Sequence, residues 1–184
     1  RPSSTPAPAA DARRAPAPAR YDRRMTTDAG TKTESDAGDL TIRDLEPADR
    51  DAWAALFRGY REFYELEHDD TVIDTVWNWL QDPGHELNAL LAVRDGAPVG
   101  IAHWRRFARP SRGATAIFLD DLFVSPDVRG GGAGRALLSR LHEIAREEGL
   151  IEVRWITSYT NTDAQRLYDR VALRAPFHTY IDQV

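Results

Sequence analysis

The fold of this chain is decided by residues 120–138, which read DDLFVSPDVRGGGAGRALL. An apolar segment that carries two acids leads into a short turn, a glycine-rich loop and an amphipathic segment. Glycines allow the backbone to approach an anion closely, and the first amides of a helix have no partner within the helix. The pattern therefore predicts a strand, a loop and a helix start that together hold a phosphate group.

The spacing of the glycines tests which phosphate ligand fits the loop. A P-loop ends in Gly-Lys-Ser or Gly-Lys-Thr, and this stretch contains no lysine. A dinucleotide fingerprint needs glycines at its first, third and sixth positions, and the sixth position counted from Gly130 is Arg135. The spacing that remains is Arg-x-x-Gly-x-Gly after a strand, formed by Arg129, Gly132 and Gly134.

The rest of the chain reads as strands and helices in succession. Apolar runs and alternating patterns predict strands at residues 40–45, 87–94, 99–107, 115–124, 150–157 and 177–181. Helical spacing predicts helices from Pro47 to Tyr64, after Asp70, from the glycine loop to Gly149, and over residues 162–172. The predicted order is β-α-α-β-β-β-α-β-α-β, which is typical of an α/β protein with a mixed sheet in one domain.

At the glycine loop the sequence resembles the GNAT superfamily of acyl-CoA-dependent N-acetyltransferases. A second pattern supports this resemblance, because Asn161, Ala164, Leu167 and Tyr168 look like the family's Asn-x-x-Ala-x-x-Leu-Tyr. The resemblance covers about residues 40–182 and implies the single-domain GNAT fold, a mixed, mostly antiparallel central sheet flanked by helices. After the tyrosine many members continue with Gly-Phe, whereas this chain has Asp169-Arg170. The resemblance therefore does not predict the form of the last hairpin.

The resemblance implies acetyl-CoA as the co-substrate, with its pyrophosphate at the glycine loop and the helix start. The residues expected to bind it are Phe123, Val124, Arg129, Gly130, Gly131, Gly132, Ala133, Gly134, Arg135 and Asn161. Val124 is expected to use its backbone groups, as the edge of a strand does. Taken alone, Asn161 could be only an N-cap or turn residue, and the two roles are compatible.

The chemistry of acetyl transfer needs a proton donor for the leaving thiolate. The chain has no cysteine, so the amine is expected to attack the thioester directly within a ternary complex. The resemblance implies that Tyr168 is the donor, and a phenol with a pKa of about 10 stays protonated at neutral pH. Helical periodicity alone would instead make Tyr168 a core aromatic.

Asp120 and Asp121 are candidates for the base that takes a proton from the amine. The segment from Phe118 to Val124 is similar to Leu-Glu-Asp-Phe-Phe-Val of the diamine (spermidine/spermine) N-acetyltransferases, which places both acids on the acceptor side. Strand alternation predicts that they point to opposite faces, so that at most one enters a given site. The alternative is a pair of hydrogen-bonded structural acids.

Other charged residues bear on the acceptor. Acids gather at the end of the first helix and in the loop after it, at Glu62, Glu65, Glu67, Asp69 and Asp70. Such a cluster would attract a cationic amine, and the competing interpretation is a solvated helix end. Arg105 or Arg106, on the strand beside the acid pair, could bind a carboxylate of the acceptor. The five histidines show no metal-ligand spacing, so no metal site is predicted.

Charge and composition narrow the class of partner. Residues 39–184 hold 17 basic and 24 acidic side chains, a net of −7, which argues against nucleic acid. No apolar run approaches the roughly eighteen residues that a membrane span needs. Residues 1–38 are rich in Pro, Ala and Arg, and are predicted to be a disordered extension before an N-acetyltransferase domain at 39–184.

Together these patterns favour an acetyl-CoA-dependent N-acetyltransferase that acts on a primary amine of a small, polyamine- or diamine-like cation. Amino-acid-like and aminoglycoside amines rank behind. The enzyme is expected to be cytoplasmic and homodimeric. The alternatives are an acetyltransferase of protein N-termini or lysines, and an acyl-CoA-binding module without turnover.

Overall fold

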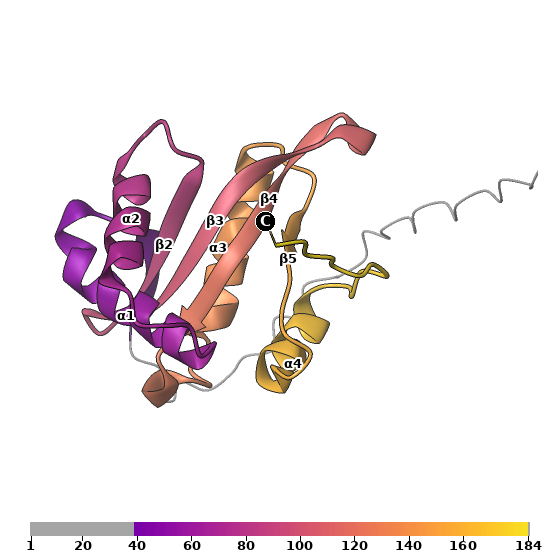
Figure 1. Cartoon of the computed structure of the whole chain (residues 1–184). Helices are drawn as coiled ribbons and strands as arrows, with labels where there is room; N and C mark the ends of the chain where they lie inside the picture. Colours follow the sequence, from indigo (N-terminus) through magenta and orange to yellow (C-terminus); the bar gives the residue numbers. More distant parts are fainter. Residues whose placement is uncertain (1–38, 184) are drawn as a thin grey trace, which may run out of the picture. The chain divides into compact units, whose positions relative to one another are not determined.

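The computed structural model describes residues 39–183, which form a five-stranded sheet with helices on both faces (Figure 1). The strands are β1 (Leu40–Asp44), β2 (Leu87–Arg94), β3 (Ala97–Arg109), β4 (Ala114–Val124) and β5 (Val153–Trp155). The helices are α1 (Arg50–Phe63), α2 (Asp70–Gln81), α3 (Ala133–Glu147) and α4 (Thr162–Val171), with short 3₁₀ turns at Pro47–Asp49, Pro110–Arg112 and Pro126–Val128. The sheet order is β1-β2-β3-β4-β5, with β1 to β4 antiparallel and β5 parallel to β4.

This architecture confirms the predicted α/β class and mixed sheet, with a correction at the C-terminal end. The strand predicted over residues 177–181 does not form, and residues 172–183 contain neither strand nor helix. Phe177 and Tyr180 are 79% and 90% exposed, because nothing in the described residues covers this segment. β5 is also shorter than predicted. The predicted N-terminal extension, residues 1–38, lies outside the described residues.

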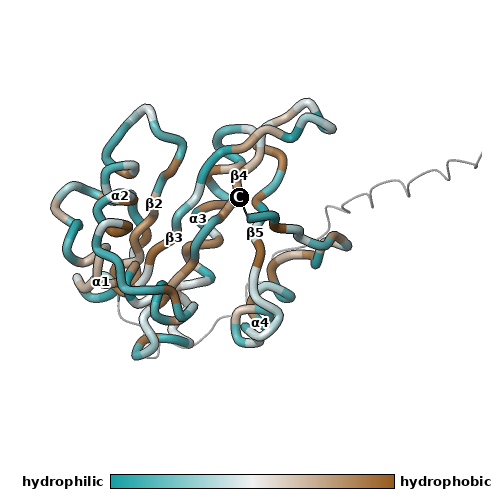
Figure 2. The backbone as a smooth tube through the Cα atoms, viewed as in Figure 1, coloured by the Kyte–Doolittle hydropathy of each residue, from teal (hydrophilic) through white to brown (hydrophobic). Residues whose placement is uncertain are grey.

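Neighbouring residues of a strand point to opposite faces of the sheet. The central strands carry apolar residues on both faces, and helices cover each face, so both faces are buried. Leu90 and Leu91 of β2, for example, belong to different hydrophobic clusters. The cluster under α1 and α2 contains Trp53, Phe57, Ile73, Trp77, Leu91, Ile101 and Phe123. The cluster under α3 contains Leu90, Ala102, Trp104, Ile117, Leu119, Leu137, Leu138 and Leu141. Figure 2 shows hydrophobic residues concentrated along the central strands, while the connecting loops are hydrophilic.

A β-bulge at residue 120 changes the direction of the two aspartates. β3 pairs His103 with Asp121 but Trp104 with Leu119, so Asp120 is an extra residue on β4. The bulge interrupts the alternation, and both carboxylates meet residues of the α1 face of β3. Asp121 contacts His103, and Asp120 contacts Arg105. The prediction of opposite faces is therefore wrong, since strict alternation requires an unbroken ladder.

Candidate active site

The ladder between β4 and β5 is short and leaves the second half of β4 with a free edge. β5 pairs only with Ile117, Phe118 and Leu119. Within the described residues, β4 beyond Leu119 has β3 on one side and no strand on the other. A strand edge of this kind can bind an extended ligand through main-chain hydrogen bonds. Phe123 and Val124 lie on this edge. Their side chains pack in the two hydrophobic clusters, so only their backbone groups are available to bind a ligand.

The glycine-rich loop follows β4 and ends at the first turn of α3. Gly130 and Gly132 have φ values of 83° and 87°, a region that other residues adopt only with strain. The amides of Ala133, Gly134 and Arg135 find no backbone or side-chain acceptor among the described residues. Unpaired amides at a helix start, together with the positive end of the helix dipole, bind anions such as phosphate.

Two arginines hold the loop in place. Arg94, at the end of β2, donates a hydrogen bond to the carbonyl oxygen of Gly131. A Cβ at position 131 would meet this guanidinium, which would have to move aside. Arg129 donates from Nε to the Val124 carbonyl at 3.3 Å, and its guanidinium lies 5.3 Å from the centre of the Phe63 ring. Arg129, predicted to bind the co-substrate, is thus tied to β4 and α1.

An open groove of about 450 Å³ lies beside the start of α3. It is lined by Ile42, Gly132, Arg135, Ala136, Ser139, Arg140 and Glu143. A Cβ at Gly132 would meet no atom within 4 Å, so this position opens onto free space. Gly132 and Arg135, which are predicted to bind the co-substrate, therefore line a groove next to the unpaired amides. This arrangement suits a ligand that carries a phosphate.

Tyr168, Asn161 and Tyr64 come together from distant parts of the chain. Asn161 caps α4, with its Oδ1 accepting from the Ala164 amide at 3.2 Å, and its Nδ2 lies 3.5 Å from the Tyr64 hydroxyl. Tyr168 packs edge-on against Trp155, with ring centroids 5.2 Å apart. Burial, with a smaller effect of Tyr64, raises the pKa of Tyr168 to about 12. Its hydroxyl therefore stays protonated at neutral pH. Tyr64 was not among the predicted site residues, because in the sequence it is only the end of the helix predicted from Pro47.

On the α1 face the two aspartates have different partners. Asp120 forms an ion pair with Arg105, whose Nε lies 3.2 Å from Oδ2. Burial raises the pKa of Asp120 above the usual range of aspartate, and Arg105 opposes the rise. Tyr60 of α1 lies close to both acids, and burial followed by Asp121 raises the pKa of its hydroxyl. Asp120 is thus a carboxylate whose proton affinity is increased by its surroundings.

His103 is a buried polar residue of this site that sequence analysis missed. It is 1% exposed, with Nε2 at 2.8 Å from the indole Nε1 of Trp53 and Nδ1 at 2.9 Å from Oδ2 of Asp121. A search for metal-ligand spacing does not find such a residue, since its partners are a tryptophan and an aspartate. His103 lies opposite Asp121 in the β3–β4 ladder, and this pairing would have identified it. The pairing is known only when the register of the two strands is known.

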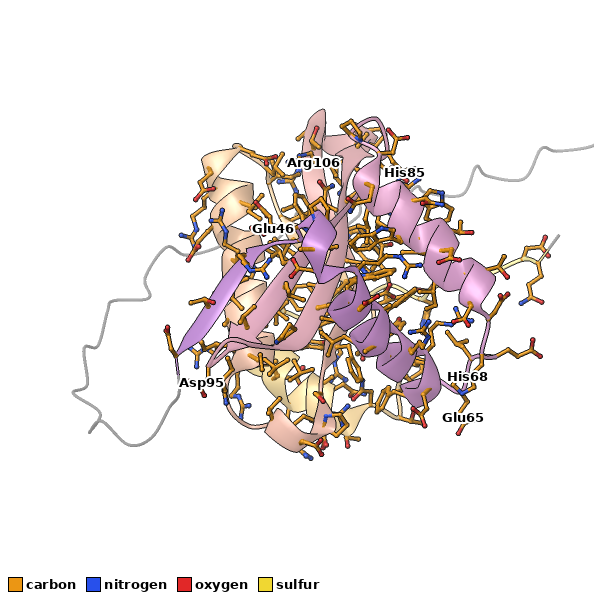
Figure 3. The ribbon with its side chains drawn as sticks, turned by 90° about the vertical axis from the view of Figure 1, so that its left-hand side faces the viewer. Glu46, Glu65, His68, His85, Asp95 and Arg106 are labelled. Carbon is orange, nitrogen blue, oxygen red and sulfur yellow. The ribbon has the colours of Figure 1, made fainter. Side chains whose placement is uncertain are left out.

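Two of the acidic residues after α1, Asp69 and Asp70, have local partners. Asp69 caps the first turn of α2, and Asp70 pairs with Arg58 at 2.7 Å. A hollow of about 190 Å³ beside them is lined by Arg58, Arg61, His68, Asp69, Asp70 and Ile73. Figure 3 shows Glu65 and His68 at the tip of this loop, pointing away from the sheet. Local pairing and solvation account for these acids.

The two arginines considered for the acceptor lie in different surroundings. Arg105 is beside Asp120 on the α1 face, whereas Arg106 pairs with Glu148 just beyond the end of α3. Arg105 is therefore the one that can meet an acceptor near the acid pair. Over residues 39–183, no group of three His, Asp or Glu side chains is placed to hold a metal ion.

A family model described as the Acetyltransferase (GNAT) family matches residues 53–172, more than half of the chain. The chain therefore belongs to the GNAT family of acetyltransferases. The matched range contains the free edge of β4, the glycine loop and Tyr168.

Individual relatives agree with this assignment. The chain is 29% identical over 137 residues to the D-amino-acid N-acetyltransferase HPA3 of Saccharomyces cerevisiae, covering 73% of this chain and 85% of the yeast protein. It is 30% identical over 126 residues to the aminoglycoside N(6')-acetyltransferase type 1 of Stenotrophomonas maltophilia, covering 61% and 72%. The aminoglycoside N-acetyltransferase AAC(6')-Iy in complex with CoA shares the fold, with a TM-score of 0.66, 19% identity, and 80% and 95% of the two chains covered. The protein is an acyltransferase enzyme of the N-acetyltransferase class.

Acetyl-CoA is the co-substrate that this family implies, and the residues present fit it. The unpaired amides from Ala133 to Arg135 suit a pyrophosphate, and the free edge beyond Leu119 suits an extended arm. Among the described residues, none of the helices combines the length and the apolar character needed to cross a bilayer.

Proposed function

We propose that this enzyme transfers the acetyl group of acetyl-CoA to the primary amine of a small cationic molecule, a diamine or polyamine, by direct attack in a ternary complex. The observation that carries the proposal is the placement of Asp120 and Asp121 on one face of β4, beside its free edge. Two carboxylates in one place attract an ammonium group and offer it a proton acceptor.

On the donor side, the chain would bind and orient the co-substrate. The amides of Ala133, Gly134 and Arg135 would hold the pyrophosphate, and the backbone of Phe123 and Val124 would bind the extended arm. Asn161 and the loop glycines would complete this side. Acetyl-CoA supplies the activated carbonyl, and holding it next to the amine can lower the barrier by several kcal/mol, up to about 7–11 in ideal cases.

Two proton transfers complete the reaction. Asp120, whose pKa is raised by burial, would accept a proton from the amine, directly or through a water molecule. Tyr168, whose hydroxyl stays protonated at neutral pH, would give a proton to the leaving thiolate. The two groups act on opposite ends of the reacting pair, so neither has to exchange its role during turnover.

Arg105 favours a second class of acceptor, a molecule that carries a carboxylate as well as an amine. Its side chain is 34% exposed beside Asp120, and a guanidinium can bind a carboxylate through two parallel hydrogen bonds. An amino-acid-like acceptor would place its ammonium at the acids and its carboxylate at Arg105. The yeast relative is a D-amino-acid N-acetyltransferase, which agrees with this second candidate.

Release of free CoA thiol from acetyl-CoA, measured against diamines, D- and L-amino acids, aminoglycosides and peptides, tests the proposal. We expect the highest kcat/KM with diamines. Highest activity with amino acids would select the second candidate, and activity confined to peptides would indicate acetylation of proteins. Binding of acetyl-CoA without thiol release for any amine would show a binding module and would refute the proposal.

The proposed assembly is a homodimer. Support comes from the C-terminal segment, where Leu173, Phe177 and Ile181 are 83%, 79% and 82% exposed although all three are apolar. Exposed apolar groups of this size are commonly covered by a partner. Light scattering at micromolar concentration is expected to give twice the chain mass, and a monomer mass at all concentrations would contradict the assembly.

A further inference from the structure

We propose that His103 is a positioning residue that holds the Asp121 carboxylate in one orientation in the acceptor site, and that Trp53 determines which nitrogen of His103 carries the proton. The inference rests on the proposed function, because it assigns a role in the acceptor half of that site. Its basis is a chain of contacts from the core to the site: Trp53 on α1, His103 on β3 and Asp121 on β4.

The direction of each hydrogen bond follows from the chemistry of the donors. An indole N–H can only donate, so Nε2 of His103 must accept the 2.8 Å hydrogen bond from Trp53. A neutral imidazole with an acceptor at Nε2 has its proton on Nδ1. Nδ1–H therefore donates to Oδ2 of Asp121 at 2.9 Å. Trp53 and His103 are 0% and 1% exposed, so water cannot replace either partner.

The burial gradient along this chain points toward the acceptor site. Asp121 has 22% of its side chain exposed, whereas the imidazole behind it has 1%. Oδ2 of Asp121 is engaged by the buried imidazole, and Tyr60 and Asp120 lie close to the same carboxylate. Around His103 the charged or titratable groups are Asp121 and Asp120 of β4, Arg105 of β3 and Tyr60 of α1.

The competing interpretation is a buried histidine that only stabilises the fold, and two substitutions separate the two roles. In His103→Asn the side-chain amide can take the place of Nδ1–H and donate to Asp121, but the Trp53 N–H loses its acceptor. In His103→Gln the side-chain oxygen can take the place of Nε2 and accept from Trp53, but Asp121 loses its donor. Each variant keeps one of the two hydrogen bonds.

A purely structural role and a positioning role predict opposite orders for these variants. His103→Asn leaves the larger cavity and an unpaired, fully buried indole N–H, so it should lower the melting temperature more than His103→Gln. The positioning role predicts that His103→Gln lowers kcat/KM for the amine at least tenfold more than His103→Asn. The KM for acetyl-CoA should stay unchanged in both variants, since the donor site lies at the glycine loop.

Trp53→Phe with Trp77→Phe as its matched control gives a second test. Trp77 lies in the same hydrophobic cluster, with its ring centroid 5.2 Å from that of Trp53, and it has no hydrogen bond to His103. Both variants remove the same atoms from that cluster. Trp53→Phe should lower kcat/KM for the amine by several fold more than Trp77→Phe, because only Trp53→Phe removes the hydrogen bond to Nε2 of His103.

NMR of the full-length protein labelled with ¹⁵N-histidine provides a readout that does not depend on turnover. There are five histidines, and the His103 signal is assigned as the one missing from His103→Gln. The expected result at neutral pH is a proton on Nδ1 in the wild type and in Trp77→Phe, and a mixture of tautomers in Trp53→Phe.

The outcomes separate this inference from the proposed function. A proton on Nε2 in the wild type, or an activity of His103→Asn as low as that of His103→Gln, would overturn the positioning role. Absence of thiol release by the wild type with every amine would refute the proposed function instead. The NMR result would then still decide whether the Trp53–His103–Asp121 chain exists.

Discussion

Asp120 and Tyr168 owe their chemical properties to where their side chains are buried. A carboxyl moved out of water binds its proton more tightly, as Asp120 does, and a phenol moved out of water loses its proton less readily, as Tyr168 does. Desolvation thus makes the aspartate a better proton acceptor and keeps the tyrosine a proton donor. In the proposed reaction, the same physical effect would therefore suit the two groups to opposite tasks.

The pH profile of kcat/KM should report the ionisation of Asp120. A base works only when deprotonated, so the rate should rise with pH through the pKa of Asp120, which lies above the usual range of aspartate. Asp120→Asn should remove this acid limb and lower kcat/KM by about 10²–10⁴-fold. Asp51→Asn, at a side chain that is 100% exposed, should change neither. Loss of the limb in Asp121→Asn but not in Asp120→Asn would assign the base to Asp121.

Tyr168→Phe should lower kcat by about 10²-fold or more, because a general acid contributes on that scale. Binding of acetyl-CoA and the melting temperature should change little, since the ring keeps its packing against Trp155. Tyr159→Phe, at a position 88% exposed, is the control and should behave as the wild type. Equal turnover in the two variants would show that Tyr168 is only a core aromatic.

At the scale of elements, β4 carries the acid pair and the free strand edge of the candidate site. Its first half is paired on both sides, and its second half has a free edge that begins at the bulge of Asp120. The strand then runs into the glycine loop and α3, whose first amides are unpaired. Because donor and acceptor groups share one continuous segment, their separation is set by a strand, which is a rigid element.

Gly132→Glu should weaken acetyl-CoA binding by at least 100-fold. Two like unit charges about 4 Å apart repel by roughly 4 kcal/mol at an effective dielectric constant near 20. Gly96→Glu, in the β2–β3 hairpin, is a matched control, because Gly96 has a φ of 78°, close to the 87° of Gly132, and equally open surroundings. Both variants carry the same backbone strain and the same charge. Isothermal titration with acetyl-CoA should show loss of binding only in Gly132→Glu. Retained binding in that variant would show that the pyrophosphate binds elsewhere.

At the scale of the whole molecule, α1 and α2 cover one face of the sheet and α3 covers the other (Figure 1). The acceptor groups lie on the α1 face, and the glycine loop leads into the helix of the opposite face. β4 lies in the sheet between the two helix layers, and the loop after it leads to α3. Among residues 39–183, the members of both hydrophobic clusters lie between Leu40 and Val171.

A fragment of residues 39–184 should fold as the full chain does. Both core clusters and every strand and helix of the described residues lie within it, so removal of residues 1–38 should change stability by less than about 0.5 kcal/mol. That corresponds to a shift of about 2 °C or less in the melting temperature, measured by calorimetry. A fragment that unfolds at a much lower temperature would show that residues 1–38 contribute to the folded structure.

Much of the fold and half of the site could be predicted from local patterns. The range of β2 was predicted without error, and the helix start at Ala133 follows from the glycines before it. Tyr168 and Asn161 lie seven residues apart on one helix and its cap, so their spacing is visible in the sequence. Patterns of this kind depend on residues that are neighbours along the chain.

The strand predicted at residues 177–181, the opposite faces of Asp120 and Asp121, and the missed role of His103 share one cause. Each depends on which segments pair, and in what register. A strand needs a neighbour, and residues 172–183 have none among the described residues. The bulge arises from the β3–β4 ladder as a whole, and a run of residues on one strand does not reveal it.

By itself, the sequence predicted an α/β fold and a glycine loop at residues 129–135 that suits a phosphate, since glycine spacing and helical periodicity are local properties, and its motifs resemble those of the GNAT family. Only the tertiary structure decided that Asp120 and Asp121 share a face, that His103 lies behind Asp121, and that Asp70 pairs with Arg58. These features join α1, β3 and β4, which lie far apart in the sequence. The residues of the proposed acceptor site could therefore be assigned only after burial and strand register were known.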